Sequence, residues 1–423
     1  MITKDLSVTA RFKKLFDGDG TKENPFVISS NKEFQNMQYY PNAYYELSSD
    51  LNLLNTIYEP IFSESNKFQG KFDGNDHTIK NMTINTETNL PSLFGYVGIN
   101  GEITNLKMTD VEINIPHIKL TDRPLCVGAI ASVSFGKLSN IVVSGSIFGE
   151  GLNFGTVAIG GLVGQTINLV ESCSSNFNIN LDNIGLSQDK FALDVGGLIG
   201  VVGGDVKNCS SFGQINLNSK ENSNPNARIL GGLIGTYADT YPITEMNVIN
   251  CISSVNILSN FAAYCAGLIG YVETAIKFNV LECSANGNIS TTGNGAGGGL
   301  LGYFFAEDNS IIADCYSSGN IEIAGFGAGF AEQIKGYYGA LKIKNCYSLG
   351  NVSGGGRNAG FALEVKAEMK NCYSTGNVIS FGISSGFIYS FEGTLEKCYN
   401  VGKVVSGCRF YLSNQFKKLR KSY

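Results

Sequence analysis

Two short phrases alternate along most of the chain, and their alternation limits the possible folds more than any other feature. The first phrase is GGLVG at 160–164, and it returns as GGLIG at 196–200 and 231–235 and as GGLLG at 298–302. It decays toward the C-terminus to AGFAE, AGFAL and SGFIY, with copies 26 to 36 residues apart. The second phrase, such as KNCYSTGNV at 370–378, lies between copies of the first. A fixed order at this period predicts stacked repeat units.

The second phrase carries a cysteine at one fixed position. The cysteines at this position are Cys173, Cys209, Cys251, Cys283, Cys315, Cys346, Cys372 and Cys398. The same position continues upstream as Met82, Leu106 and Ile141, so about eleven units are recognisable. Because all of these side chains are apolar and of modest size, we expect the position to point into the core as a structural ladder.

Each unit holds two or three short runs in which apolar and polar residues alternate, bounded by Gly and Asn. Such runs predict β-strands joined by turns, and a unit of about 26 residues predicts one coil of a parallel β-helix. One coil cannot bury its inner face, so the coils must stack, about 4.8 Å apart. Eleven coils would form an all-β rod of roughly 50 Å. The longer intervals predict loop insertions at Asn216–Ile229 and Ala238–Val248.

Asn and Gly recur at fixed places around the cysteine position. Asn precedes it in most units, where it tolerates left-handed backbone and can bond along a ladder. Gly follows four residues later, for example at Gly319 and Gly350, where a tight turn is expected. Near the N-terminus, Ser29 to Asn31 followed by Lys32–Tyr39 predicts a short helix that caps the first coil, with Asn31 as a candidate N-cap.

The alternating phrases GGLxG and NCYSxGNV resemble the GLUG repeat of bacterial surface proteins. The stretches FDGDGTKENPFVIS, YYELSSDLNL and FQGKFDGNDHTIKNMTI, between Phe16 and Ile84, also resemble the opening module of such proteins. The resemblance covers about 16–402 and implies a right-handed, single-stranded parallel β-helix that is extracellular, adhesive or structural, and without catalytic residues. The implied organisation is a basic extension at 1–15, a cap and first coils at 16–98, repeats at 99–408, and a basic cap or tail at 409–423.

The charge distribution argues against nucleic acid as a partner. The pI is near 5.3, and the central body carries −13 between termini of +3 (1–15) and +5 (409–423). The basic ends are either solvated caps or contacts for an assembly partner. The first fifteen residues lack the apolar stretch of a signal peptide, and the longest weakly polar run, Phe261 to Val272, is too short to span a bilayer.

Several motifs suggest chemistry but fit the repeat better. Gly382–Gly386 matches the nucleophile elbow, yet both histidines, His77 and His117, lie upstream of it. Gly293–Gly298 matches a dinucleotide fingerprint but leads into a repeat strand, and Asp17–Gly20 lacks the later ligands of a calcium loop. The eleven cysteines contain no C-x-x-C pair, so we expect reduced, buried thiols and no metal or cofactor.

One outward position is aromatic in the last four coils. Tyr316, Tyr347, Tyr373 and Tyr399 each follow a ladder cysteine, so they should form a row about 5 Å apart. The row is either a binding surface for a glycan or protein ligand or a ladder that stabilises the coils. We therefore expect a non-enzymatic structural or adhesive solenoid at the cell surface. The alternatives are a phage or tailocin appendage in a virion and a glycan-cleaving β-helix enzyme.

Overall fold

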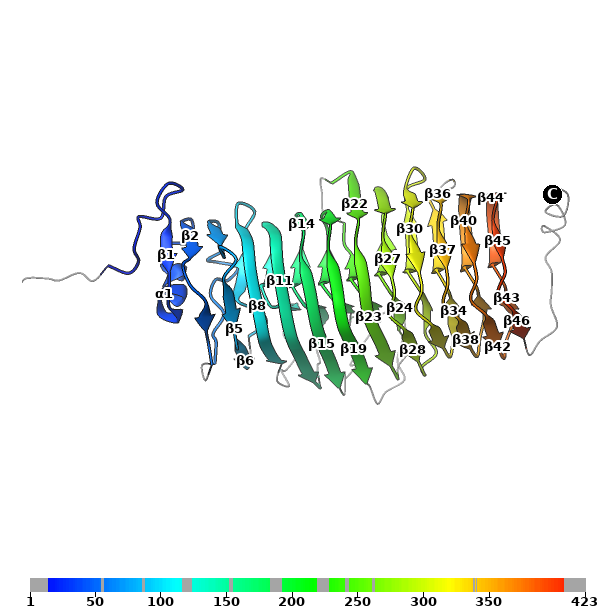
Figure 1. Ribbon diagram of the computed structural model, residues 1–423, viewed down its shortest axis with the longest axis horizontal. Coiled ribbons are helices and arrows are strands. Elements are labelled where there is room, and N and C mark those ends of the chain that lie inside the picture. The colour runs from blue at the N-terminus through cyan, green and yellow to red at the C-terminus, as the bar shows by residue number, and fades with distance from the viewer. Residues whose placement is uncertain are drawn as a thin grey trace, which may run out of the picture.

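The computed structural model describes residues 14–54, 57–85, 88–115, 124–151, 155–182, 192–218, 228–239, 243–260, 263–337, 339 and 341–406. These residues form an elongated rod in which the chain winds repeatedly around one long axis (Figure 1). The basic tail, Cys408 and His117 lie outside the described residues, as does most of the basic N-terminal extension.

One sheet of the rod contains a single strand from each regular turn. Its nine strands all pair in parallel with the equivalent strand of the next turn, which defines a parallel β-solenoid. They are β9 (Leu125–Val127), β12 (Thr156–Gly160), β16 (Ala192–Gly196), β20 (Arg228–Gly231), β24 (Tyr264–Ala266), β29 (Ala296–Gly298), β34 (Phe326–Ala328), β39 (Asn358–Ala359) and β43 (Ser384–Ser385). The rod thus has about nine regular turns, and the count of eleven from the repeats is wrong.

The GGLxG phrase forms the bend between this sheet and a second column of strands. Its central residue points inward and is fully buried at Leu198 and Leu268, for example. The second column comprises β7 (Phe94–Val97), β10 (Ala131–Ser134), β13 (Val163–Thr166), β17 (Ile199–Val202), β21 (Ile234–Tyr237), β25 (Ile269–Glu273), β30 (Leu301–Ala306), β35 (Ala331–Gly336), β40 (Ala362–Lys370) and β44 (Ile388–Glu396).

The remaining strands flank the cysteine position. Before it lie β14 (Val170–Glu171), β18 (Val206–Lys207), β22 (Glu245–Ile249), β26 (Lys277–Leu281), β31 (Ile311–Ala313) and β36 (Leu341–Lys344). Around or after it lie the long β8 (Glu102–Ile115), β11 (Lys137–Glu150), β15 (Ser174–Asp182), β19 (Ser210–Asn218) and β23 (Ile252–Ser259). In later turns these long strands divide into β27 (Ser284–Ala285), β28 (Ile289–Thr291), β32 (Tyr316–Ser317), β33 (Ile321–Ile323), β37 (Tyr347–Ser348), β38 (Val352–Gly354), β41 (Tyr373–Ser374), β42 (Val378–Ser380), β45 (Tyr399–Asn400) and β46 (Val404–Ser406).

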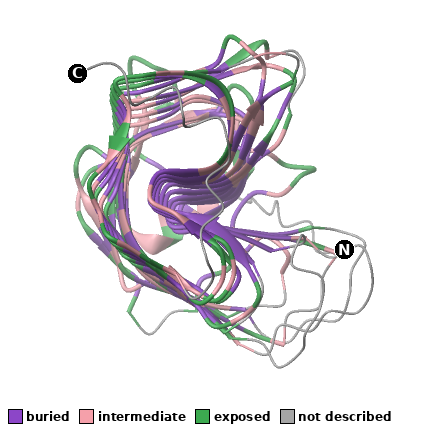
Figure 2. Cartoon of the chain, turned by 90° about the vertical axis from the view of Figure 1, so that its right-hand side faces the viewer, coloured by how far each residue is buried: buried purple, intermediate pink, exposed green. Residues whose placement is uncertain are grey.

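The predicted left-handed position before the cysteine is confirmed. Asn208 and Asn250 have φ of 55° and 51°, and the Asn250 amide donates to the Asn208 side-chain oxygen at 2.8 Å. The glycine four residues after the cysteine position serves close approach. At Gly319 an added Cβ would lie 1.8 Å from the Gly287 carbonyl oxygen of the neighbouring turn. Viewed down the axis, the buried residues line the inside of the superimposed turns (Figure 2).

The first turns are less regular than the repeat predicts. They contain β1 (Phe26–Ile28), β2 (Tyr44–Leu47), β3 (Leu51–Asn52), β4 (Lys71–Asp73), β5 (Thr78–Lys80) and β6 (Thr83–Asn85). Leu106 is paired with Ile141 on the next turn, but Thr83, which follows Met82, is paired with Glu112. Met82 is therefore buried but does not belong to the cysteine column, contrary to the prediction.

A short helix lies at the N-terminal end of the rod, as predicted (Figure 1). It comprises α1 (Asn31–Asn36) followed by the 3-10 helix η1 (Met37–Tyr39). The N-cap is Ser30 rather than Asn31, because the Ser30 hydroxyl accepts the Glu33 N–H at 3.3 Å. The Glu33 carboxylate in turn accepts the Ser29 N–H at 2.8 Å, which satisfies another backbone donor near the start of the helix.

Of the two predicted insertions, part of each lies outside the described residues. In Asn216–Ile229, strand β19 runs to Asn218 and β20 begins at Arg228. In Ala238–Val248, β22 begins at Glu245, so the end of that interval is a strand rather than a loop.

Candidate functional site

The structure places the cysteines of the repeat above one another inside the rod. The residues next to them pair in sequence, for example Ser210 with Ile252 and Tyr347 with Tyr373. The cysteines from Cys173 to Cys372 are buried and free, while Cys398 is free and half-buried. Each thiol of this column finds a backbone acceptor, such as the Glu171 carbonyl at 3.3 Å from Cys173 Sγ.

Burial makes several of these thiols poor nucleophiles. It raises the pKa of the Cys173 and Cys346 thiols well above the usual value, and it raises the pKa of Cys265, outside the column, to about 12. Since the thiolate is the reactive form, these residues act as small apolar groups of the core.

The four predicted tyrosines lie side by side on the outside of the last turns; we call them the tyrosine row. The ring centroids of Tyr316 and Tyr347, and of Tyr347 and Tyr373, are 5.0 Å apart with the planes within 5° of parallel. Tyr373 and Tyr399 are separated by 5.4 Å. Because each inner ring is covered on both faces by its neighbours, a ligand can reach mainly ring edges and hydroxyl groups.

Polar groups run beside the tyrosine row with the same repeat. The Asn371 amide donates to the Asn345 side-chain oxygen at 3.0 Å, and the Asn345 amide donates to Asp314 at 2.8 Å. On the other side of the row, Leu349 and Val401 are 41% and 66% exposed. The row is therefore bordered by an amide ladder on one side and by alternating polar and exposed apolar side chains on the other.

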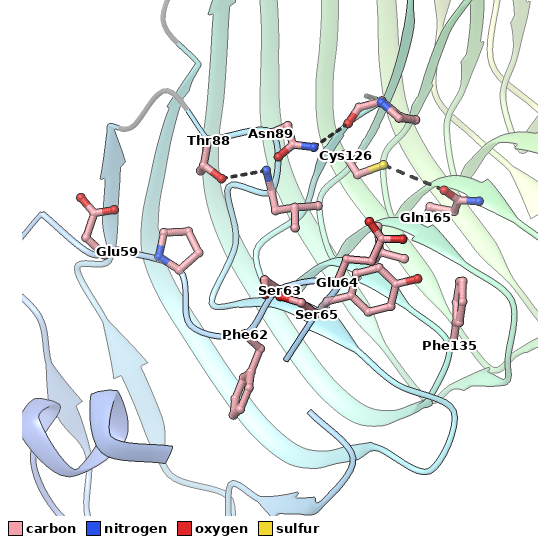
Figure 3. Close-up of a pocket in the computed structure, with 15 residues that line it drawn as sticks. Glu59, Phe62, Ser63, Glu64, Ser65, Thr88, Asn89, Cys126, Phe135 and Gln165 are labelled. Atoms are coloured by element: carbon pink, nitrogen blue, oxygen red, sulfur yellow. Dashed lines mark hydrogen bonds between the residues drawn. The ribbon is translucent and has the colours of Figure 1, made fainter. Parts of the chain in front are cut away.

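A second surface feature, which the sequence did not predict, is a pocket on the flank of the early turns; we call it the flank pocket (Figure 3). It has a volume of about 650 Å³, within the range of roughly 300–1,000 Å³ typical of small-molecule sites. The residues that line it are Glu59, Pro60, Phe62, Ser63, Glu64, Ser65, Thr88, Asn89, Leu90, Tyr96, Pro124, Cys126, Val133, Phe135 and Gln165.

The walls of the flank pocket come from three consecutive turns. Tyr96, Val133 and Gln165 form one outward column, because they pair in register on β7, β10 and β13. The opposite wall is the segment around Asn89, whose amide donates to the Pro124 carbonyl at 3.3 Å. The Cys126 thiol donates to the Gln165 side-chain oxygen at 4.0 Å and so joins the two walls.

The third wall is a turn with strained backbone. Phe62 has a φ of 67°, which is unusual for a bulky side chain. The turn closes through reciprocal backbone bonds between Ser63 and Asn66 at 3.1 and 3.2 Å. Gly95 permits its approach, since an added Cβ there would lie 2.4 Å from the Phe62 carbonyl oxygen. Strained residues held by their surroundings concentrate at binding sites, so this turn marks the pocket as a built feature.

Two largely buried carboxyl groups outside the apolar core have raised pKa values. Burial raises the pKa of Asp194 to about 6, although the Thr236 hydroxyl donates to it at 2.7 Å. Burial, with a smaller contribution from Glu364, raises the pKa of Glu332 to about 7. Glu332 adjoins the cluster of Tyr264, Tyr271 and Tyr303, and its Oε2 atom is buried without a hydrogen-bond partner.

The described residues contain neither a metal cluster nor a membrane-spanning helix. Within them, no three His, Cys, Asp or Glu side chains are grouped so that they could hold a metal ion. No helix in the described part is long and apolar enough to cross a bilayer.

Comparisons with known proteins agree with the solenoid class but do not identify a family. No protein-family model matches the chain. A crystal structure from Bacteroides ovatus, provisionally named an immunoglobulin A1 protease, superimposes with a TM-score of 0.50 over 66% of this chain and 80% of that one. At 19% identity, this likeness shows the fold alone.

Two curated proteins resemble parts of the chain in sequence. One, from Evansella cellulosilytica, is provisionally named a Gly-rich membrane protein and is 32% identical over 135 residues, which cover 30% of this chain and 15% of that protein. The other is halomucin from Haloquadratum walsbyi, 27% identical over 168 residues, which cover 36% of this chain and 2% of halomucin. The chain thus matches only a small part of either relative.

Sequence reasoning found the tyrosine row but missed the flank pocket. The tyrosines share a repeat position and so are visible as a pattern. The pocket residues Glu64, Asn89 and Gln165 belong to three separate segments with no common phrase. The one available signal is the outward column of Tyr96, Val133 and Gln165, which can be read only once the register of β7, β10 and β13 is known.

Proposed function

We propose that this chain is a non-enzymatic structural and adhesive module of a bacterial surface protein, which binds a glycan or protein through the side of its rod. The observation that carries the proposal is the tyrosine row, an evenly spaced line of aromatic edges with hydroxyl groups along four turns. Repeated weak contacts along such a line add to useful affinity, because each further contact is made at high local concentration.

The names of the two relatives support a surface location. One is named a membrane protein and the other a halomucin, and the resemblance of the GGLxG and NCYSxGNV phrases to GLUG repeats suggests the same setting. We include GLUG membership in the proposal, together with placement outside the cell. A virion appendage gains no support from these names.

The two carboxyls with raised pKa values, Asp194 and Glu332, do not form a pair with each other. In the nine-stranded sheet, the strand that bears Asp194 lies four turns from β34, the strand that directly precedes Glu332. At about 4.8 Å per turn this is roughly 19 Å, whereas paired glycosidase carboxyls lie about 5–10 Å apart. The protease name of the structural neighbour belongs to that protein, and we propose no proteolysis here.

The proposal is tested with Tyr347→Ala combined with Tyr373→Ala. We expect this variant to lose binding on a glycan array and in a cell-adhesion assay, while the free energy of unfolding falls by about 1–2 kcal/mol from lost ring contacts. A matched control is Tyr271→Ala with Tyr303→Ala, a second outward pair stacked at 4.8 Å. Unchanged binding together with a large fall in stability would show that the row is only a structural ladder.

A further inference from the structure

The flank pocket combines an aromatic corner with hydrogen-bonding groups beside it. The rings of Tyr96 and Phe135 meet at a centroid distance of 5.3 Å and an angle of 75°. Gln165 lies two turns along the same outward column as Tyr96, and Glu64 lies near the corner (Figure 3). A site of this composition fits a ligand that has both an apolar surface and several hydroxyl groups.

Charge at the pocket narrows the ligand class. Glu59 and Glu64 disfavour an anionic ligand such as a sialylated or sulfated glycan. Lys67 holds its ammonium group 4.7 Å from the Tyr96 ring centroid and 5.8 Å from that of Phe135, which disfavours a cationic one. With carboxylates in the lining and the Lys67 ammonium beside it, a neutral ligand is the best electrostatic match.

The polar groups of the pocket are only partly engaged within the protein. The Asn89 amide and the Cys126 thiol are held by internal contacts at 3.3 and 4.0 Å, which fix the wall. Glu64 is exposed and its carboxylate lies close enough to raise the pKa of the Tyr96 hydroxyl further, after burial. A ligand hydroxyl could donate to Glu64 and accept from the Gln165 amide, using groups that the fold already orients.

From this arrangement we infer that the flank pocket binds a neutral oligosaccharide, with one pyranose ring against the half-buried Phe135 ring and its hydroxyl groups directed to Glu64 and Gln165. A pyranose has an apolar C–H face and a rim of hydroxyl groups, which match the aromatic ring and the polar groups beside it. The inference deepens the proposed function by naming a ligand class, but its site is separate from the tyrosine row.

The test is calorimetric titration of the full chain with cellotetraose, maltotetraose, mannotriose and triacetylchitotriose, and with sialyllactose as an anionic probe. We expect at least one neutral probe to bind in the millimolar range or tighter. Gln165→Ala and Glu64→Gln should each weaken that binding at least about fivefold, and Phe135→Ala more than about tenfold.

The control substitution is Gln333→Ala, which changes the same outward column several turns further on. Gln165 and Gln333 are connected through successive register pairs from β13 to β35. Gln333→Ala should leave sugar binding unchanged, and circular dichroism melts of all variants separate loss of binding from loss of fold.

Three other results of these titrations would contradict the inference, and they can be told apart. No heat with any neutral probe, or tighter binding of sialyllactose than of the neutral probes, excludes a neutral-sugar pocket. Binding that survives all three pocket variants but disappears in Tyr347→Ala with Tyr373→Ala also excludes it, while leaving the proposed adhesive function intact. Loss of the proposed function would instead require that neither set of variants affects adhesion.

Discussion

Most aromatic ring pairs near the N-terminal cap meet at an angle, whereas most pairs in the last turns are parallel. Near the N-terminal cap, Phe94 meets Phe34 and Phe72 at angles of 72° and 64°, with centroids 5.6 Å apart. In the last turns, Phe361 stacks on Phe330 at 4.6 Å with the planes within 7° of parallel. The tyrosine row repeats this parallel stacking on the outside of the same turns.

The difference shows what a repeat imposes on packing. Where turns pair in strict register, equivalent residues lie one above the other, which brings identical rings such as Phe330 and Phe361 into a stack. At the cap the register is broken and the rings interlock from several directions. We expect the cap to be one cooperative unit, whereas the last turns depend mainly on their immediate neighbours.

The substitution with the largest expected effect tests whether the cap unfolds as one cooperative unit. Phe94→Ala removes a fully buried ring that contacts four other phenylalanines and should lower the free energy of unfolding by about 3–5 kcal/mol. Urea denaturation gives the magnitude, and hydrogen exchange gives its extent along the rod.

Phe361→Ala is the matched substitution in the stacked region. It should raise hydrogen exchange mainly in the turns next to β39 and leave the cap protected. If both variants raised hydrogen exchange equally along the whole rod, the distinction between a cooperative cap and locally stabilised turns would be wrong.

A glycine substitution tests how closely the repeating turns approach. In Gly299→Ala the new Cβ would meet the Gly329 carbonyl oxygen at 1.9 Å, so the backbone must shift. We expect a loss of about 3 kcal/mol, measured by urea denaturation. Gly155→Ala is the control, because no atom lies within 4 Å of its added Cβ, and it should change stability by less than about 0.5 kcal/mol.

The buried carboxyl of Glu332 gives a pH-dependent prediction. Its pKa is raised from 4.5 to about 7, so between these pH values the folded protein keeps a proton that the unfolded chain has released. Stability therefore falls as the pH rises through this window and remains lowered above it. Glu332→Gln should remove this dependence and stabilise the protein at pH 8 by about 2 kcal/mol in thermal or urea melts.

Glu364→Gln is the contrasting variant. The Lys335 ammonium, 2.6 Å away, lowers the pKa of Glu364, so its charged form is the one that folding favours. Its removal should slightly destabilise the protein at pH 8. A Glu332→Gln protein whose melting temperature still falls between pH 5 and 7 by as much as the parent's would contradict the assignment.

The smallest expected effect concerns the thiols. Because the ladder cysteines are buried and free, a reductant should leave the melting temperature unchanged. In native protein, Cys398 should react with a thiol dye before any other ladder cysteine, since it alone among them is half-buried. If denatured, unreduced protein contained fewer than about seven free thiols, the prediction that the ladder cysteines are reduced would be wrong.

The repeat made the regular part of the fold predictable. A left-handed Asn such as Asn250 and a buried Leu such as Leu198 each return in successive turns, so pattern and structure coincide. The place of Met82 was wrong because a local phrase does not reveal strand register. Ile79 is paired with Met108 and Thr83 with Glu112, so Met82 lies several residues beyond the position of Leu106. The count of eleven units included Met82 and was therefore too high.

The two candidate sites also differ in how far the sequence predicts them. The tyrosine row follows from one repeated position, although the sequence did not indicate that stacking would cover the ring faces. The flank pocket depends on a strained turn at Phe62 and on which outward residues meet across turns. No local pattern encodes that meeting, because it is decided by the register of strands far apart in the sequence.

The direction of the hydrogen bonds between turns has a mechanical consequence. These bonds lie along the rod, so a pull on its two ends loads one turn after another instead of shearing many bonds together. A turn of 26 residues that peels away adds roughly 90 Å of extended chain. Under flow or traction, such a rod would lengthen in steps and dissipate energy at each one, as an extensible tether does.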